Sequence, residues 1–266
     1  MRSSHHHNHH ARRLLCLTAL ACFVAGGTAY ACTRKAAVPQ LPELPAESLE
    51  QPAEYGVQQS TLTAAQAQAL LDDPRMILVN RAHPITEDYP VETKECGSAT
   101  AINKTLQTEA ADAFLSMQAA AAKDGVDVRM QSGYRSVSYQ KKLYDNKTQY
   151  YRDKGLSEAA AREKAAVIVN PPGCSEHNCG LAADLNSPEH TGLDEGFENT
   201  AAFRWLCQHA GEYGFILRYP KGAEEKTEIT YEPWHWRYVG VENAAKINAS
   251  GLCFEDYIAA LQQIAG

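Results

Sequence analysis

The sequence lacks an excess of positive charge. Its 25 Lys and Arg residues are outnumbered by 32 Asp and Glu residues, which gives a net charge of −7. Proteins that bind nucleic acids usually carry a basic patch, and no charge run here suggests a polyelectrolyte partner. We therefore expect no nucleic-acid partner.

Internal repeats and long hydrophobic runs are also missing. The most marked apolar run, residues 14–25, is short for a membrane span of about 20 residues. Hydrophobic residues make up 44% of the chain, which is ordinary for a globular protein and enough to fill a core. The 266 residues predict one sizeable domain with appendages.

The N-terminal segment has the pattern of a secretory signal peptide. Arg12 and Arg13 precede the apolar run, and small residues follow it up to the A-x-A site at 29–31. We predict a signal peptide over residues 1–31. An uncleaved membrane anchor and a lipoprotein acylated at Cys32 remain alternatives. The His-rich cluster at residues 5–10 lies upstream of the predicted cleavage and takes no part in the site.

A proline-rich segment follows the predicted signal peptide. Residues 32–62 hold Pro39, Pro42, Pro45 and Pro52 among Glu, Gln and Ala, a composition typical of a semi-extended linker. We predict that this linker holds a folded domain, residues 63–266, away from a membrane or wall. The expected location is the cell envelope or the exterior, with membrane attachment through the N-terminal segment or a lipidated Cys32 left open.

Five cysteines lie beyond the signal segment, at positions 96, 174, 179, 207 and 253. An exported protein meets an oxidising environment, so disulfides are expected, although spacing cannot assign the partners. We predict Cys174–Cys179, which would close a small loop around His177, and Cys207–Cys253. The competing interpretation makes Cys174 and Cys179 zinc ligands, but their C-x4-C spacing has no second C-x2-C partner.

The pattern of apolar and turn residues predicts an α+β fold with a small antiparallel sheet flanked by helices, because helices and strands mix without regular βαβ alternation. Capping and terminating residues mark the helix ends. The expected helices are 63–71, 101–123, 137–154, 157–167, 200–213 and two short ones from Glu242 and Glu255. The expected strands are 76–79, 126–130, 181–185, 215–219 and 234–239.

Two short segments carry the chemistry, S-E-H-N-C-G-L-A-A-D at 175–184 and E-P-W-H-W-R at 232–237. Together they offer His177, Asp184 and His235 as metal ligands, with Glu232 free to move protons. A catalytic zinc site needs three N/O ligands, an open fourth position and a nearby base. Asp184 lies in an apolar run, where a carboxylate is costly unless it pairs or binds a metal. Taken singly, Asp184 and His235 could each be structural; together they predict a zinc hydrolase.

The joint pattern S-x-H-x-x-G-x-A-x-D and E-x-W-H-x-R-Y-V-G resembles the VanY-like D-alanyl-D-alanine carboxypeptidases, which are zinc enzymes of bacterial peptidoglycan. The resemblance runs from about Leu78 to Tyr257 and includes S-G-Y-R-S at 132–136. It implies the fold shared with hedgehog-type and lysostaphin-side-group domains. It also implies one zinc ion per chain, held by His177, Asp184 and His235, with Glu232 as the catalytic acid and base.

The resemblance further implies that Arg135 polarises the scissile carbonyl and stabilises the oxyanion, although a surface ion pair is the alternative. A carboxypeptidase must also hold the free carboxylate of its substrate. Ser175 is the first candidate for that contact, unless it only caps the loop. Gln131 and Tyr134 are weaker candidates for the pocket.

The expected activity is removal of the terminal D-alanine from peptidoglycan stem peptides by an exported D,D-carboxypeptidase. The nearest alternative is an L,D-carboxypeptidase acting on tetrapeptide stems, which the sequence does not separate from the first. The alternative of another class is a non-catalytic, zinc-containing module that binds peptidoglycan. Such a module would be expected to lose its proton shuttle, whereas Glu232 is present.

Overall fold

The computed structural model describes residues 62–266, which lie within one compact unit. The predicted signal peptide, the cleavage site, Cys32 and the proline-rich linker up to residue 61 lie outside the described residues. Within residues 62–266, no helix is long and apolar enough to cross a membrane.

A four-stranded antiparallel sheet forms the centre of the domain. Its strands are β3 (Arg129–Ser132), β4 (Ala182–Asn186), β5 (Phe215–Leu217) and β6 (His235–Tyr238), in the order β3-β4-β6-β5. Every residue of β4 and β6 is buried, as expected for central strands covered on both faces. The predicted α+β class with a small antiparallel sheet is confirmed.

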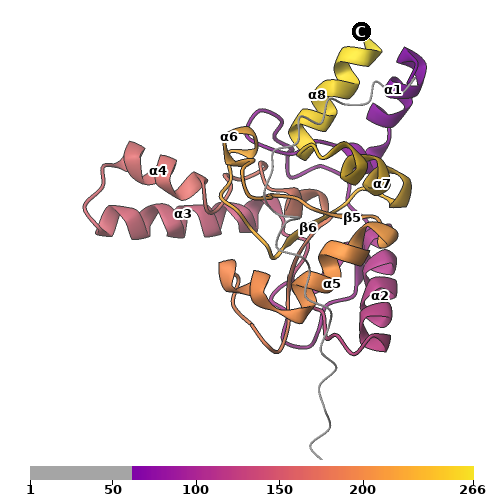
Figure 1. Cartoon of the computed structure of the whole chain (residues 1–266). Helices are drawn as coiled ribbons and strands as arrows, with labels where there is room; N and C mark the ends of the chain where they lie inside the picture. Colours follow the sequence, from indigo (N-terminus) through magenta and orange to yellow (C-terminus); the bar gives the residue numbers. More distant parts are fainter. Residues whose placement is uncertain (1–61) are drawn as a thin grey trace, which may run out of the picture. The chain divides into compact units, whose positions relative to one another are not determined.

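Two helices cover the sheet on the side that holds the main core. The first is α2 (Thr108–Lys123), and the second is α5 (Ala201–His209), which continues as a 3-10 helix over Ala210–Tyr213 (Figure 1). Phe114 and Met117 of α2 pack in one cluster with Leu185 of β4 and Trp236 of β6. A separate two-stranded sheet, β1 (Thr93–Glu95) and β2 (Thr105–Gln107), lies against α2.

A second apolar cluster joins the two ends of the described chain. Helix α1 (Ala64–Leu71) packs on α8 (Phe254–Ala265), and α7 (Val241–Ser250) lies nearby (Figure 1). Met76, Ile216 and Phe254 are buried in this cluster. The short helix α6 (Glu224–Thr227) contacts α8. The C-terminal helices therefore pack against the sheet edge formed by β5.

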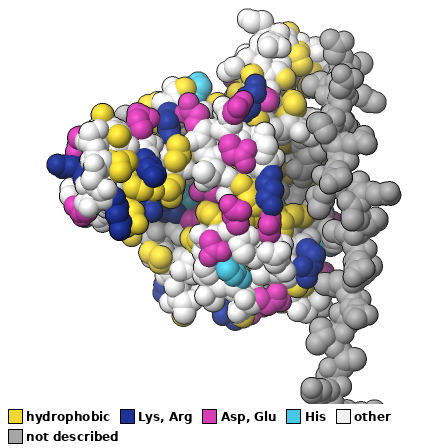
Figure 2. Space-filling model, turned by 60° about the vertical axis from the view of Figure 1, so that its left-hand side comes forward, with side chains coloured by type: hydrophobic (Ala, Val, Ile, Leu, Met, Phe, Trp, Pro, Cys, Tyr) yellow, Lys and Arg dark blue, Asp and Glu magenta, His cyan; other side chains and the backbone are white. Residues whose placement is uncertain are grey.

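Helices α3 (Val137–Asp153) and α4 (Glu158–Ala166) form a hairpin that projects from the body of the domain (Figure 1). Each begins at a serine, Ser136 or Ser157, whose hydroxyl accepts a hydrogen bond from a backbone N–H of the first turn. A small cluster of Tyr144 with Ala165 and Ala166 holds the two helices together. We call this hairpin the arm. Figure 2 shows hydrophobic side chains interspersed with Lys and Arg on it.

Two predicted elements differ from the structure. Residues 76–79 form no strand, because Pro74–Met76 is a 3-10 helix and Ile77 to Val79 run on without a strand partner. The helix predicted from residue 101 begins only at Thr108. The preceding Thr105–Gln107 pairs as strand β2 with β1, and the side chain of Gln107 caps the helix. Here a tertiary pairing overrides a helix-compatible composition.

The predicted disulfides are absent: all five cysteines in the described part of the chain are free thiols. Cys174 and Cys179 flank the His177 loop, but their thiols face different carbonyl oxygens, those of Pro172 and Glu176. Cys207 lies on α5, and Cys253 is the N-cap of α8. The prediction of Cys174–Cys179 and Cys207–Cys253 is therefore wrong for this structure. Sequence spacing does not reveal where each thiol points.

Candidate metal centre

His177 lies on a tight turn that leads into the central sheet. The turn is a 3-10 helix, Glu176–Cys179, that ends at Gly180 with φ +74°. A Cβ at Gly180 would lie 2.9 Å from Val91 and 3.1 Å from the backbone nitrogen of Gln107, so the close approach requires glycine. His177 Nδ1 lies 2.8 Å from the carbonyl oxygen of Gly133. That contact places the ring proton on Nδ1 and leaves Nε2 free for a metal.

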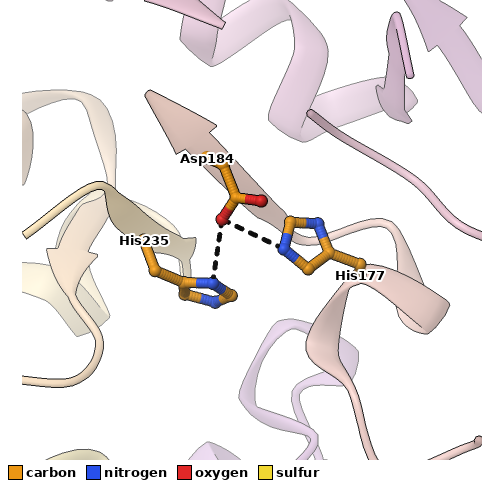
Figure 3. A group of neighbouring side chains, drawn as sticks. All are labelled: His177, Asp184 and His235. Atoms are coloured by element: carbon orange, nitrogen blue, oxygen red, sulfur yellow. Dashed lines mark hydrogen bonds and ion pairs between the residues drawn. The ribbon is translucent and has the colours of Figure 1, made fainter. Parts of the chain in front are cut away.

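The register of the sheet brings Asp184 and His235 together. They are direct partners across the antiparallel pair β4–β6, so their side chains lie on the same face. Asp184 Oδ1 lies 3.2 Å from His235 Nδ1 and 3.2 Å from His177 Nε2. Figure 3 shows both rings directed at this one carboxylate oxygen. The three sequence-predicted ligands are thus brought together.

The donor set fits a zinc ion. The three ligand atoms lie within 4.8 Å of one another, and all three residues are buried. A tetrahedral zinc with bonds of about 2.0–2.1 Å separates its ligand atoms by about 3.3 Å. The two observed 3.2 Å separations are close to that value. Two imidazoles and one carboxylate form the donor set of a catalytic rather than a structural zinc site.

Burial and neighbouring charges shift the pKa values of the three groups. Burial lowers the pKa of His177, and Arg135 lowers it further, to about 4. Burial also opposes the charged form of His235, but the neighbouring carboxylates of Asp184 and Glu176 raise its pKa to about 9. Asp184 is buried too, yet His177 and Arg135 hold the pKa of its carboxyl well below the usual value. Without a metal, the cluster therefore carries a carboxylate beside one protonated ring.

Glu232 approaches the same cluster from the turn before β6. The backbone N–H of His235 donates to the carbonyl of Glu232 at 3.1 Å, and Pro233 lies within the turn. This bend, not a helix, places Glu232 Oε2 3.6 Å from His235 Nδ1. Burial raises the pKa of Glu232 to about 8, and the nearby carboxylate of Asp184 adds to the rise. A carboxyl with such a pKa can both accept and donate a proton near neutral pH.

Arg135 is held against the cluster from the other side. Its Nη2 donates to Asp184 Oδ2 at 2.6 Å and lies 3.0 Å from His177 Nε2. Its Nε donates to Ser132 Oγ at 3.2 Å. The alternative interpretation of Arg135 as a surface ion pair does not match this position, since the guanidinium lies at the candidate ligands.

A cavity of about 550 Å³ opens onto the centre. Its walls include the three candidate ligands together with Glu232, Arg135 and Ser175. Ser175 is buried and its side chain makes no capping hydrogen bond, so its hydroxyl is free to face a substrate. Tyr134 lines a second cavity instead. Gln131 lines neither cavity and accepts a hydrogen bond from Asn186, so the structure brings neither residue to the pocket predicted for them.

The sequence reasoning missed several residues near the centre. The cavity is also lined by Tyr219, Thr230 and two residues of the arm, Lys147 and Tyr150. Glu176 and Arg218 form a buried ion pair behind His235, with Arg218 Nε 2.7 Å from Glu176 Oε1. One signal was available for Arg218: a charged residue in the apolar segment 215–219 requires a buried partner.

These features define a class. A small antiparallel sheet presents a buried His–Asp–His group to a cavity, beside a buried carboxyl of raised pKa. This is the arrangement of a mononuclear metallohydrolase. The family comparison is more specific. Residues 103–241 match the model of the VanY family, D-alanyl-D-alanine carboxypeptidase, and the chain belongs to this family.

Relatives agree with this membership. A D-alanyl-D-alanine carboxypeptidase of Enterococcus faecalis is 37% identical over 203 residues, which cover 76% of this chain and 72% of the relative. A structure of VanYB in complex with D-alanine-D-alanine is also 37% identical, with a TM-score of 0.61, covering 70% of this chain and 97% of the other. A mutant of the D,D-pentapeptidase VanY, solved in complex with Zn(II), matches at 37% identity and a TM-score of 0.60. The match covers 69% of this chain and 98% of the other.

The LD-carboxypeptidase LdcB is a further structural relative, 34% identical with a TM-score of 0.60, covering 73% of this chain and 87% of the other. The predictions of the VanY family, of a zinc-dependent carboxypeptidase and of its fold are confirmed by these matches. The chain is a zinc metallocarboxypeptidase of the D-alanyl-D-alanine type.

Proposed function

We propose that His177, Asp184 and His235 hold the zinc ion, and that the enzyme uses this site to trim the terminal D-alanine from peptidoglycan stem peptides. The convergence of the three side chains on one point beneath the cavity carries the proposal. Zinc bound there supplies Lewis-acid chemistry and lowers the pKa of a water molecule to about 7. The surrounding residues then bind, orient and move protons.

Glu232 moves the protons in this proposal. Its carboxylate accepts a proton as water attacks the scissile carbonyl carbon, and it then donates that proton to the departing amine of D-alanine. The raised pKa of about 8 suits both steps. Only 9% of the residue is exposed, and the carboxyl lines the cavity in which the substrate would bind.

Arg135 stabilises the negative charge that develops on the carbonyl oxygen. Its guanidinium is already fixed at the cluster by Ser132 and Asp184, so little reorganisation is needed during the reaction. Ser175 donates its hydroxyl to the terminal carboxylate of the substrate. Ser175 lines the cavity, and its hydroxyl makes no helix-capping hydrogen bond, which supports the assignment.

The proposed place of action is the cell envelope, after export directed by residues 1–31. Peptidoglycan stems lie outside the membrane, and the basic, apolar and small-residue pattern of this segment fits a signal peptide. The proline-rich residues 32–62 then act as a spacer that holds the domain away from a membrane or wall. Attachment through the N-terminal segment or an acylated Cys32 is the alternative to cleavage and release.

Mass spectrometry of purified stem peptides tests the function. The chain is incubated with pentapeptide and tetrapeptide stems, with and without a chelator. We expect loss of one alanine from the pentapeptide, abolished by the chelator and restored by zinc. Loss of alanine from the tetrapeptide alone would assign the L,D activity of the LdcB type, and binding of either peptide without any mass change would make the chain a binding module.

A further inference from the structure

Glu176 is a buried carboxylate that the proposed reaction does not use. It has no exposed surface and does not line the cavity, although it directly precedes His177 in the sequence. Its side chain extends behind the site and approaches the far edge of the His235 ring. Two guanidinium groups, those of Arg218 and Arg237, surround it.

The two oxygens of Glu176 have different partners. Oε1 lies 2.7 Å from Arg218 Nε and 2.8 Å from Arg237 Nη1, so both guanidinium groups approach this oxygen. Oε2 lies 3.6 Å from His235 Nε2. Among the described residues, Oε2 and His235 Nε2 are both buried without a hydrogen-bond partner, so each is the nearest candidate for the other. A buried polar atom without a partner is costly.

The opposite edge of the ring faces the candidate metal position. His235 Nδ1 lies 3.2 Å from Asp184 Oδ1, and the proposed ligation uses Nδ1. A neutral imidazole that binds a metal through Nδ1 carries its proton on Nε2, where a carboxylate is a suitable acceptor. We infer that Glu176 is the positioning residue of His235, accepting the Nε2 proton and thereby fixing the tautomer and the ring orientation that zinc requires. This inference rests on the proposed zinc site.

The surroundings of Glu176 hold it in place. Arg218 is bound on its other side by Glu255 at the start of α8, at 2.8 Å from Nη1. Arg237 donates to the backbone carbonyls of Arg75 and Ile77 at 2.7 and 2.9 Å. Both guanidinium groups are fully buried, so neither can turn away into solvent. The carboxylate behind His235 is therefore fixed from the C-terminal helix and from the segment that follows α1.

The variant Glu176→Gln tests the inference because glutamine keeps the shape of the side chain but replaces one acceptor oxygen with a donor NH2 group. Arg218 Nε donates to Oε1 and Arg237 Nη1 lies 2.8 Å from it, so we expect the amide oxygen to take that position. The amide NH2 then faces His235 Nε2 and favours the tautomer with the proton on Nδ1, which cannot bind zinc through that atom. We expect the zinc dissociation constant, measured by chelator competition, to rise about 10–100-fold.

Glu255→Gln is the matched control. It also removes a carboxylate from Arg218, but the ion pair with Arg218 is its only one among the described residues, and it does not face His235. We expect its zinc affinity to stay within about twofold of the wild type, while both variants lose thermal stability. Equal weakening of zinc binding in the two variants would reduce Glu176 to a purely structural role and overturn the inference.

A measurement on the wild-type chain decides the case if Glu176→Gln fails to fold. In the zinc-loaded protein labelled with 15N-histidine, we expect the His235 signals to show a proton on Nε2 and the metal on Nδ1. Metal on Nε2 would overturn the inference but leave the zinc site intact. Failure of the wild type to bind zinc at all would instead overturn the proposed function, so the two failures are distinguishable.

Discussion

The carboxylate of Glu232 ends 3.6 Å from Nδ1 of His235, within a turn that contains Pro233. This turn separates the proposed proton carrier from the proposed ligands: His235 begins strand β6, whereas Glu232 remains outside the sheet. The carboxyl can therefore reach a water molecule near the metal position without taking up a coordination place. Glu232 and His235, three positions apart in the sequence, can therefore have different roles.

Removal of that carboxyl should separate catalysis from metal binding. We expect Glu232→Ala to retain one zinc per chain and to lose at least about 10²-fold in kcat, the usual scale for a general acid and base. Steady-state kinetics and elemental analysis of the same sample measure the two quantities. Near-normal hydrolysis by the variant would remove Glu232 from the mechanism.

Loss of a ligand should remove metal and activity together. We expect His177→Ala to bind zinc far more weakly, because two ligands remain of three, and to lose hydrolysis in parallel. His83→Ala is the control, since that histidine is exposed and its ring contacts Asn80. Full zinc occupancy of the His177 variant by elemental analysis would contradict the ligand assignment.

Zinc affinity should depend on pH through His235. The pKa of His235 is raised from 6.5 to about 9, so the ring must release a proton before zinc can bind. The apparent affinity should therefore rise about tenfold per pH unit between about pH 6.5 and 9 and then level off. The raised pKa also stabilises the metal-free fold below pH 6.5, and this contribution is lost as the pH rises through 9. Chelator competition across this range measures the slope; a flat profile would contradict the shift.

The arm should affect long substrates more than short ones. Lys147 and Tyr150 of α3 line the cavity, and Lys147 Nζ lies 5.6 Å from the centre of the Tyr150 ring. We expect Lys147→Ala to raise KM about tenfold for a full stem peptide bearing a further carboxylate, the scale of one charged hydrogen bond. The KM for a short acylated D-alanyl-D-alanine and the kcat for both should change little.

Lys164→Ala provides the control for this experiment. Lys164 lies on α4 of the same arm, 5.1 Å from the centre of the Tyr151 ring, and does not line the cavity. It should leave both KM values unchanged. An equal effect of the two lysine variants would indicate a general effect of charge on the arm rather than a contact in the cavity.

Helices with clear capping residues were predicted closely from the sequence. Thr63 and Ser157 were expected at helix starts, and in the structure each is an N-cap whose hydroxyl accepts a backbone hydrogen bond. Capping is a local property, so a single sequence contains it. The helix expected from residue 101 failed because the pairing of β2 with β1 is not local.

The sequence predicted which residues come together at the candidate site, but not the residues that support them. His177, Asp184, His235 and Glu232 stand in a pattern whose residue types match zinc chemistry. In contrast, the proximity of Glu176 to His235 Nε2 depends on how the fold places Glu176 beside strand β6, which lies almost sixty residues later in the sequence. Likewise, the orientation of the five thiols depends on backbone directions that spacing does not encode.

Arg237 donates to the backbone carbonyls of Arg75 and Ile77, which precede the part of the chain that matches the family. The family match begins at residue 103 and stops at 241, yet a fragment cut to those limits would lose both carbonyls as well as the ring of Phe254 that lies 5.2 Å from the same guanidinium. We expect water then to reach the ion pair of Arg237 with Glu176, directly behind strand β6. The residues outside the matched range therefore support the strand that carries His235.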